Sequence, residues 1–203
     1  MTMILDFSPQ RDVPAPVGHP WPRQGQWTYE DYCRLPEDGK IYEVIEGELL
    51  MSPAPRTRHQ KCCGNLFAAL WNYNKSLRMG EVLISPVDLV LPGLGTNVQP
   101  DIVFILKERL DHINERCIEG APDLVVEVLS PWNAKIDRGK KFKVYAKAGV
   151  REYWIVDPDD RTVELYVLSE NIFKLMGKYQ ASDNVCSRIL PGFEVQVEEI
   201  CPA

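Results

Sequence analysis

The sequence predicts an α/β (α+β) domain with a mixed central β-sheet, a helix on each face and accessory β-hairpins. Two segments with helical periodicity, residues 57–78 and 134–148, alternate with apolar strand segments along the chain. The strand expected at residues 123–129 is apolar almost throughout, which is typical of a central strand covered on both faces. The 203 residues are enough for one such domain with a full core.

The N-terminal segment carries prolines and no periodicity. We therefore expect a flexible, proline-rich arm at residues 1–25, followed by a single domain at residues 26–203. Thr28 is expected to cap a short helix that runs to about Leu35, because acidic side chains in its first turn favour the positive end of the helix dipole.

Alternation and turn residues place the next elements. Residues 40–51 alternate apolar and polar side chains around Glu46 and Gly47, which predicts a hairpin. The helix at residues 57–78 follows, and Gly80 is expected to end it. The remaining expected elements are strands at residues 82–91, 98–106, 123–129, 152–156 and 193–197, a hairpin at residues 161–179, a short helical segment at residues 108–116, and the helix at residues 134–148, which Gly149 closes in the left-handed conformation.

The charge is uneven along the chain. The net charge of −6 disfavours nucleic acid as a partner, yet residues 135–151 hold seven basic residues and a single acid, Asp137. This segment therefore carries +6 and the rest of the chain −12. It could contact a phosphate backbone or form a solvated helix face, and charge alone favours the solvated face.

No targeting or membrane-spanning segment is visible. The longest apolar run, Leu66 to Trp71, is too short to cross a bilayer, and we expect a cytoplasmic protein without membrane contact. The six cysteines include no Cys-x-x-Cys pair, and Cys62 and Cys63 are adjacent. We therefore expect buried free thiols rather than a disulfide framework.

Two acids stand out against apolar surroundings. Glu127 lies inside an apolar strand, and Asp101 lies at the start of another one. Buried carboxylates are costly unless something pairs with them, and a cation between them would remove their repulsion. Oxygen ligands suit Mg²⁺ or Mn²⁺. The alternative is that each acid pairs with a separate Lys or Arg, and the two acids alone favour that simpler interpretation.

A wider pattern extends from about Thr28 to Pro158. It comprises WTYEDYCRLPEDGKIYEVIEGELLMSPAP, RHQ, VDLVLPGLGTNVQPDIVFI and GAPDLVVEVLSPWNAKIDRGKKFKVYAKAGVREYWIVDP, with PGFEV near the end. In this combination and spacing the chain resembles the PD-(D/E)xK nuclease superfamily, and most closely the Uma-type family of restriction endonucleases, formerly a domain of unknown function. The resemblance covers most of the chain and implies a restriction-endonuclease-like core.

The resemblance also implies a function and a set of site residues. It implies an endonuclease that hydrolyses phosphodiester bonds of nucleic acid, with DNA as the favoured substrate and Mg²⁺ or Mn²⁺ as cofactor. Asp101 and Glu127 match the two metal-binding acids, and the carbonyl of Val128 could add a third ligand. Glu43 matches the acid of an early Tyr-Glu signature and would complete the catalytic site. Alternatively, Glu43 is an edge-strand carboxylate that faces water.

One position departs from the superfamily pattern. Leu129 stands two residues after Glu127, where the superfamily usually has a catalytic lysine, and the Uma-type family shares this loss. Some superfamily members supply the amine from the following helix, where Asp137 and Lys141 share a face. Lys141 is the basic residue best placed to reach the carboxylates. The alternative is a lysine at the border of the buried stripe with its ammonium group in water.

These assignments suggest metal-assisted phosphodiester hydrolysis, in which Lys141 orients the attacking water or stabilises the transition state. His59 is a weaker candidate, as an auxiliary base or a phosphate contact, and so is Gln99. Together with the basic face of the second helix, three residues near the start of the first one would contact phosphates: Arg56, Arg58 and Lys61.

Other functions stay open. A catalytically inactive nuclease fold that serves as a binding or scaffold protein agrees with Leu129 and with the acidic net charge. A cysteine-dependent hydrolase near His59 lacks a visible third orienting residue. The LPGLGTN segment lacks the ending of a P-loop, which excludes that class. A homodimer is expected from the superfamily alone, because cutting both strands of a duplex requires two sites.

Overall fold

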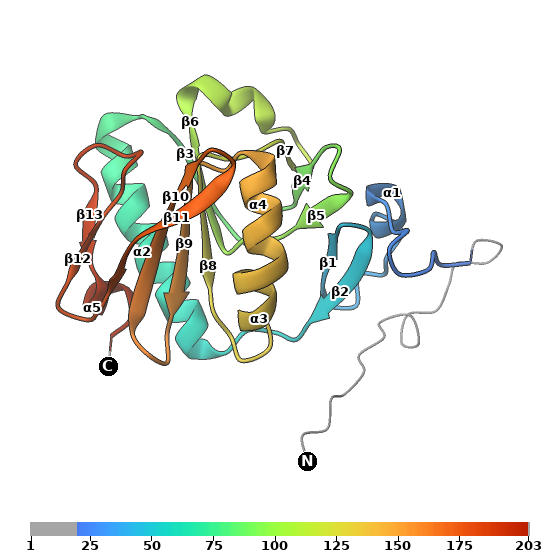
Figure 1. Cartoon of the computed structure of the whole chain (residues 1–203), viewed down its shortest axis with the longest axis horizontal. Helices are drawn as coiled ribbons and strands as arrows, with labels where there is room; N and C mark the ends of the chain where they lie inside the picture. Colours follow the sequence, from blue (N-terminus) through green and yellow to red (C-terminus); the bar gives the residue numbers. More distant parts are fainter. Residues whose placement is uncertain (1–19, 203) are drawn as a thin grey trace, which may run out of the picture.

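The computed structural model describes residues 20–202, so the first 19 residues of the arm expected at residues 1–25 lie outside the described part of the chain. Residues 20–25 are not a free arm, because they are bonded to the first hairpin (Figure 1). The side-chain amide of Gln24 exchanges two hydrogen bonds with the backbone of Leu49, and the N–H of Gly25 donates to the carbonyl of Gly47 at 2.8 Å. Gln24 and Gly25 are therefore attached to the first hairpin.

The central sheet is mixed, as predicted. Within residues 20–202 it has six strands in the order β11-β10-β9-β8-β6-β3. β8 and β9 are parallel, and the other neighbours are antiparallel. The strands are β3 (Gly80–Ile84), β6 (Ile102–Leu106), β8 (Leu124–Val128), β9 (Glu152–Asp157), β10 (Thr162–Ser169) and β11 (Ile172–Tyr179).

A second sheet was not expected as a separate layer. Its order, among the described residues, is β2-β1-β5-β4-β7, and its strands are β1 (Ile41–Ile45), β2 (Glu48–Ser52), β4 (Leu89–Leu91), β5 (Thr96–Val98) and β7 (Ile118–Glu119). The predicted single strands at residues 82–91 and 98–106 are wrong, because each is divided between the two sheets. Pro86 and Pro100 lie at the two divisions and supply no N–H to continue a ladder.

The first two helices follow the sequence signals with shifted ends. Thr28 caps α1 (Tyr29–Tyr32) through a reciprocal capping box, but the helix ends before Leu35. α2 (Thr57–Leu77) ends at Arg78, which adopts a left-handed φ of 51°. Gly80 is instead the first residue of β3, where an added Cβ would lie 2.0 Å from a backbone oxygen of β6. Close strand approach, not helix termination, therefore requires this glycine.

The basic helical segment contains an irregular turn. α3 (Ala134–Ile136) passes through a π-helical turn (Asp137–Lys141) into α4 (Phe142–Ala148), and Gly149 closes it with a φ of 92°, as predicted. The short helical segment expected at residues 108–116 is a 3₁₀ helix, Lys107–His112. The chain ends with a ribbon of β12 (Asn184–Cys186) and β13 (Glu194–Gln196), followed by α5 (Val197–Ile200).

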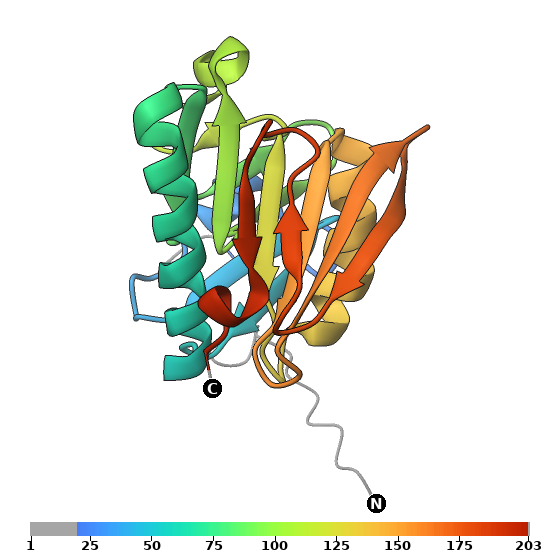
Figure 2. The same ribbon diagram turned by 90° about the vertical axis from the view of Figure 1, so that its left-hand side faces the viewer.

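Each face of the central sheet is covered, which confirms the predicted architecture. Figure 2 shows α2 and the terminal ribbon on one side and α4 on the other. One core cluster joins Leu66 of α2 to Val126 of β8, and a second joins Val144 of α4 to Val125 of β8 and Ile45 of the second sheet. No helix in this part of the chain is long and apolar enough to cross a membrane.

Candidate active site

Lys141 is surrounded by carboxylates from three parts of the fold. Its Nζ lies 2.8 Å from Oε1 of Glu43, 3.1 Å from Oε1 of Glu127 and 3.5 Å from Oδ1 of Asp137. Glu43 comes from β1 of the second sheet, Glu127 from β8 of the central sheet and Asp137 from the π turn. All four side chains are at most 5% exposed. Lys141 is therefore not a boundary lysine with its ammonium group in water, and Glu43 does not face solvent.

The π turn aims this helix at Glu127. The N–H of Phe142 donates to the carbonyl of Asp137, five residues earlier, so the turn holds an extra residue. Tyr145 lies one turn after Lys141, and its hydroxyl donates to Oε1 of Glu127 at 2.6 Å. Asp137, Lys141 and Tyr145 thus form one row beside β8. Tyr145 is a neutral partner of Glu127, so a search for opposite charges in the sequence does not find it.

Asp101 lies opposite Glu127, directly before the neighbouring strand β6. The antiparallel register pairs Ile102 with Val126, so one further step places Asp101 across from Glu127. Oδ2 of Asp101 accepts the N–H of Val128 at 2.7 Å and lies 3.2 Å from Nε2 of His59. The strand register therefore brings together the two acids that stood out in the sequence.

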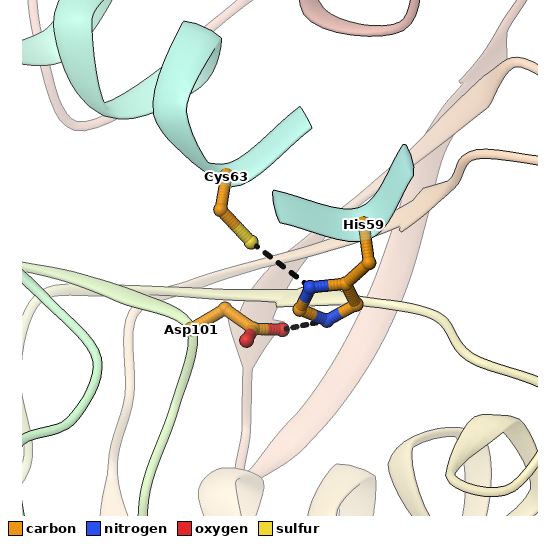
Figure 3. A group of neighbouring side chains, drawn as sticks. All are labelled: His59, Cys63 and Asp101. Atoms are coloured by element: carbon orange, nitrogen blue, oxygen red, sulfur yellow. Dashed lines mark hydrogen bonds and ion pairs between the residues drawn. The ribbon is translucent and has the colours of Figure 1, made fainter. Parts of the chain in front are cut away.

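His59 connects Asp101 to a buried thiol. Figure 3 shows His59 and Cys63 on successive turns of α2, with Nδ1 of His59 facing Cys63 and Nε2 facing Asp101. The sulfur of Cys63 lies 3.4 Å from Nδ1, and donor atoms of all three residues lie within 4.8 Å of one another, so they could hold a metal ion. The sequence analysis considered a cysteine near His59 as a nucleophile but did not identify Cys63 as a possible metal ligand, although its four-residue spacing from His59 was a usable signal.

For the cysteine-hydrolase alternative, the structure supplies an orienting residue for His59 but no accessible cysteine nucleophile beside it. Asp101 orients His59, which the sequence did not show. The Cys63 side chain, however, is buried and absent from the lining of the cavity that Asp101 and His59 reach. Burial also raises the pKa of the Cys63 thiol, and the nearby Asp101 carboxylate raises it further. Such a thiol stays protonated and inaccessible, which argues against nucleophilic catalysis.

The four predicted site residues share one cavity. It has a volume of about 300 Å³ and is lined by Glu43, Asp101, Glu127 and Lys141, with His59 beside them. Other residues complete its wall, among them Arg56, Gln99, Trp132 and Asn133. The arrangement concentrates acids, an ammonium group and an imidazole around a space large enough for a phosphate group.

Gln99 positions one of the acids. Its backbone N–H donates to Oε1 of Glu43 at 2.9 Å, and its side-chain amide donates to Oδ1 of Asp88 at 2.9 Å and to the hydroxyl of Tyr32 at 3.1 Å. This anchors the loop before Pro100 to the second sheet. Gln99, a weak candidate in the sequence, therefore supports Glu43 through its backbone.

Burial dominates the electrostatics of the cluster. Burial raises the pKa of Glu127 well above its usual value, and Lys141 only partly opposes this shift. Burial likewise raises the pKa of Asp137 to about 7. Burial lowers the pKa of Lys141, but the surrounding carboxylates outweigh it and raise the pKa overall, so the ammonium stays charged. Burial lowers the pKa of His59, but the hydrogen bond to Asp101 and the charge of that carboxylate raise it overall.

The donor set fits a hard divalent cation. Asp101 and Glu127 both line the cavity, and their carboxylate oxygens are the ligands that Mg²⁺ and Mn²⁺ prefer. Both side-chain partners of Glu127, the ammonium of Lys141 and the hydroxyl of Tyr145, contact its Oε1. Burial favours the protonated forms of Glu127 and Asp137 by raising their pKa values, and a bound cation would instead stabilise the ionised carboxylates.

The expected basic surface is largely neutralised. Arg58 pairs with the exposed Asp159, 3.2 Å away, instead of standing free for phosphates. On the second helix and just after it, four basic residues pair with acids elsewhere in the fold: Arg138 with Glu164, Lys140 with Glu48, Lys147 with Glu46, and Arg151 with Asp123. The structure therefore supports the solvated-face interpretation of this segment, with local ion pairs, over a phosphate-binding face.

Known proteins share this sequence pattern and this fold. The chain matches the Uma2 family model, described as "Putative restriction endonuclease", over residues 29–198. An uncharacterized protein of Synechocystis sp., slr1290, is 40% identical over 160 residues, which cover 77% of this chain and 82% of the relative. A second one, sll1609, is 27% identical over 125 residues, which cover 61% and 70%.

A solved structure has the same fold. It is described as a "putative nuclease belonging to DUF820" from Anabaena variabilis and superposes with a TM-score of 0.72. The alignment covers 86% of this chain and 97% of the solved one at 20% sequence identity. At that identity, the likeness establishes the fold.

Proposed function

Because the chain belongs to the Uma2 family of putative restriction endonucleases, we propose that it is a metal-dependent endonuclease that hydrolyses phosphodiester bonds, with DNA as its substrate. The single observation that carries this proposal is the shared cavity lined by Asp101, Glu127, Glu43 and Lys141. These residues come from two sheets and a helix, and no structural requirement of the core places so many charges there.

Asp101 and Glu127 are the proposed ligands of a Mg²⁺ or Mn²⁺ ion. Their positions on opposed strands and their oxygen donors support this assignment. When bound, such an ion polarises the scissile phosphate and lowers the pKa of a water molecule. Asp101 is held in place by Val128 and His59, and Glu127 by Tyr145, so the pair is preorganised by bonds that leave the cavity accessible.

Lys141 is the proposed catalytic amine. It would replace the lysine that the superfamily usually has at the position of Leu129. Its raised pKa keeps it protonated at neutral pH, so it acts as a charged donor and not as a base. It would donate to the attacking water or to a phosphate oxygen and stabilise charge in the transition state. Glu43, 2.8 Å away, holds the ammonium group in position.

The rim of the cavity offers contacts for nucleic acid. Arg56 and Trp132 line it, and the Trp132 side chain is 57% exposed. An adjoining apolar hollow of about 510 Å³, with Leu50 and Ile136 in its wall, also includes Trp132. An exposed indole next to an apolar hollow suits stacking against a base, and an arginine suits a phosphate.

An inactive nuclease fold that serves as a binding or scaffold protein is the second candidate. The observation that favours it is internal pairing: Lys141 contacts Glu43 and Glu127, and His59 contacts Asp101. In such a protein these ion pairs would be permanent, and they would not open to a metal or to substrate.

Calorimetric titration with Mn²⁺, run alongside plasmid cleavage, separates these possibilities. The variants are Asp101→Asn and Glu127→Gln, and Glu81→Gln is the matched control, because Glu81 is an exposed acid of the same sheet. Saturable binding and cleavage in the wild type and control, both lost in the two variants, support the proposal. Binding without cleavage of any nucleic acid favours the scaffold. No binding by the wild type shows that the acids are paired internally and that the metal assignment is wrong.

A further inference from the structure

A pair of thiols lies where α2 meets the C-terminal segment, and the proposed nuclease chemistry does not use it. The sulfurs of Cys62 and Cys201 are 2.9 Å apart, and both residues are 1% exposed. They are free thiols, separated by 139 positions in the sequence. Cys62 belongs to α2, and Cys201 directly follows α5.

Other bonds hold the two segments in this arrangement. The side-chain amide of Asn65, on α2, donates to the carbonyl of Ile200 at 3.1 Å, and Nε of Arg161 donates to the carbonyl of Cys201 at 2.9 Å. α2 and α5 also pack in the same core cluster, where Leu66 and Val197 are fully buried. The thiols are therefore brought together by the packing of the fold, and joining them requires little backbone rearrangement.

A small surface pocket leads to Cys62. It has a volume of about 220 Å³ and is lined by Thr57, Arg58, Lys61 and Pro202 as well as Cys62. Cys63, the neighbouring cysteine, faces His59 instead and does not line this pocket. Lys61 in the wall favours a negatively charged reagent, whereas Arg58 beside it already pairs with Asp159. Cys62 is the thiol that lines this pocket, so such a reagent reaches its sulfur first.

We propose that Cys62 and Cys201 are a redox-active pair that forms a reversible disulfide by exchange with a small anionic disulfide, such as glutathione disulfide. The Cys62 thiolate attacks one sulfur of the reagent, whose S–S bond breaks and whose first thiolate leaves and takes up a proton. Cys201, after losing its proton, then attacks the sulfur of Cys62 in this mixed disulfide and releases the second small thiol. Two protein thiols are oxidised and one small disulfide is reduced to two thiols.

The disulfide would link the start of α2 to the C-terminal segment across most of the domain. A cross-link that closes so long a loop restricts the unfolded chain and stabilises the fold. It would also fasten the helix turn that carries His59 and Cys63. The pair would therefore make the stability of the domain respond to the redox state of its surroundings.

Peptide mapping of the full-length native protein tests this proposal. The protein is equilibrated in buffers of increasing ratio of oxidised to reduced glutathione, free thiols are alkylated, and tryptic peptides are identified by mass spectrometry. Cys62 and Cys63 share a tryptic peptide, so Cys63→Ser is the matched control for Cys62→Ser and Cys201→Ser. The exposed Cys33 reports in each sample whether the reagent is active.

The expected result is a cross-link between the peptides of residues 62 and 201 in the wild type and in Cys63→Ser, absent in the other two variants and removed by dithiothreitol. The oxidised wild type should also melt at a higher temperature than the reduced protein. Glutathione on Cys33 without any cross-link in the wild type, or a cross-link that persists in Cys62→Ser, would overturn the proposal. The wild type and Cys63→Ser decide the outcome even if the other variants fold poorly.

Discussion

Nζ of Lys141 and Oε1 of Glu43 lie 2.8 Å apart and connect two layers of the fold. Lys141 belongs to the helical segment against the central sheet, and Glu43 belongs to β1 of the second sheet. The contact is buried and is completed by Glu127, so the layers meet at a charge cluster as well as at an apolar interface. Stability and the proposed activity therefore depend on the same ammonium group.

Removing that ammonium group should destabilise the domain. In Lys141→Met, the carboxylates of Glu43, Glu127 and Asp137 stay buried without their cation, and we expect a loss of about 3–5 kcal/mol in the free energy of unfolding. Urea denaturation in a metal-free buffer measures it. Lys143→Met, at an exposed position of the same helix, is the control and should change little. Equal stability of the two variants would contradict the ion-pair arrangement.

Glu43 should act as a positioning residue. Glu43→Gln keeps the size of the side chain and the bond from the backbone of Gln99, but it weakens the hold on Lys141. We expect kcat for cleavage to fall about 10²-fold, as for loss of one preorganised electrostatic contact, with little change in KM or in Mn²⁺ affinity.

The control for this variant is Glu48→Gln, because Glu48 pairs with Lys140 at the surface of the neighbouring strand. It should leave kcat unchanged. A fall in Mn²⁺ affinity for Glu43→Gln, in parallel with kcat, would make Glu43 a metal ligand instead.

The titration of Asp137 should make the metal-free protein less stable as the pH rises. Burial raises its pKa in the folded state from 3.8 to about 7, so between these values the folded protein holds a proton that the unfolded chain releases. Stability is therefore highest below about pH 4 for this group and is lost as the pH rises to about 7.

Asp137→Asn cannot titrate and should flatten this slope. Denaturation of the wild type and the variant at a series of pH values, in the presence of a chelator, gives the free energy of unfolding of each as a function of pH. Subtracting the two curves removes the contribution of the other acids, which both proteins share. Asp159→Asn, at an exposed acid, should leave the slope unchanged. A wild-type slope that survives in Asp137→Asn would assign the proton to another group.

Trp132 should contribute to nucleic-acid binding. Replacing the exposed indole with alanine removes a stacking surface, and we expect single-stranded oligonucleotides to bind about 5- to 150-fold more weakly, equivalent to roughly 1–3 kcal/mol. Fluorescence anisotropy without metal measures the Kd and avoids cleavage. Trp71→Ala is the control, because Trp71 is similarly exposed, on α2, but does not line the cavity. Equal effects of both substitutions would remove Trp132 from the binding surface.

Local signals in the sequence were sufficient for most helices and strands. The capping residue Thr28, the turn at Glu46 and Gly47, and the cap at Gly149 act through nearest neighbours, so their effects survive in any context. Strand limits were less secure, because the two interrupted strands are divided between two sheets by contacts with distant partners.

The sequence by itself determined that Asp101 and Glu127 are unusual, because a charge in an apolar strand is visible without any structure. Only the tertiary structure decided that Glu43 is buried, that Lys141 contacts three acids, and that Cys62 meets Cys201. These are contacts between segments far apart in the chain, and their geometry depends on how layers pack and on a π turn that shifts one helix face. Periodicity describes which residues share a face of one element, and it contains no information about which other element that face meets.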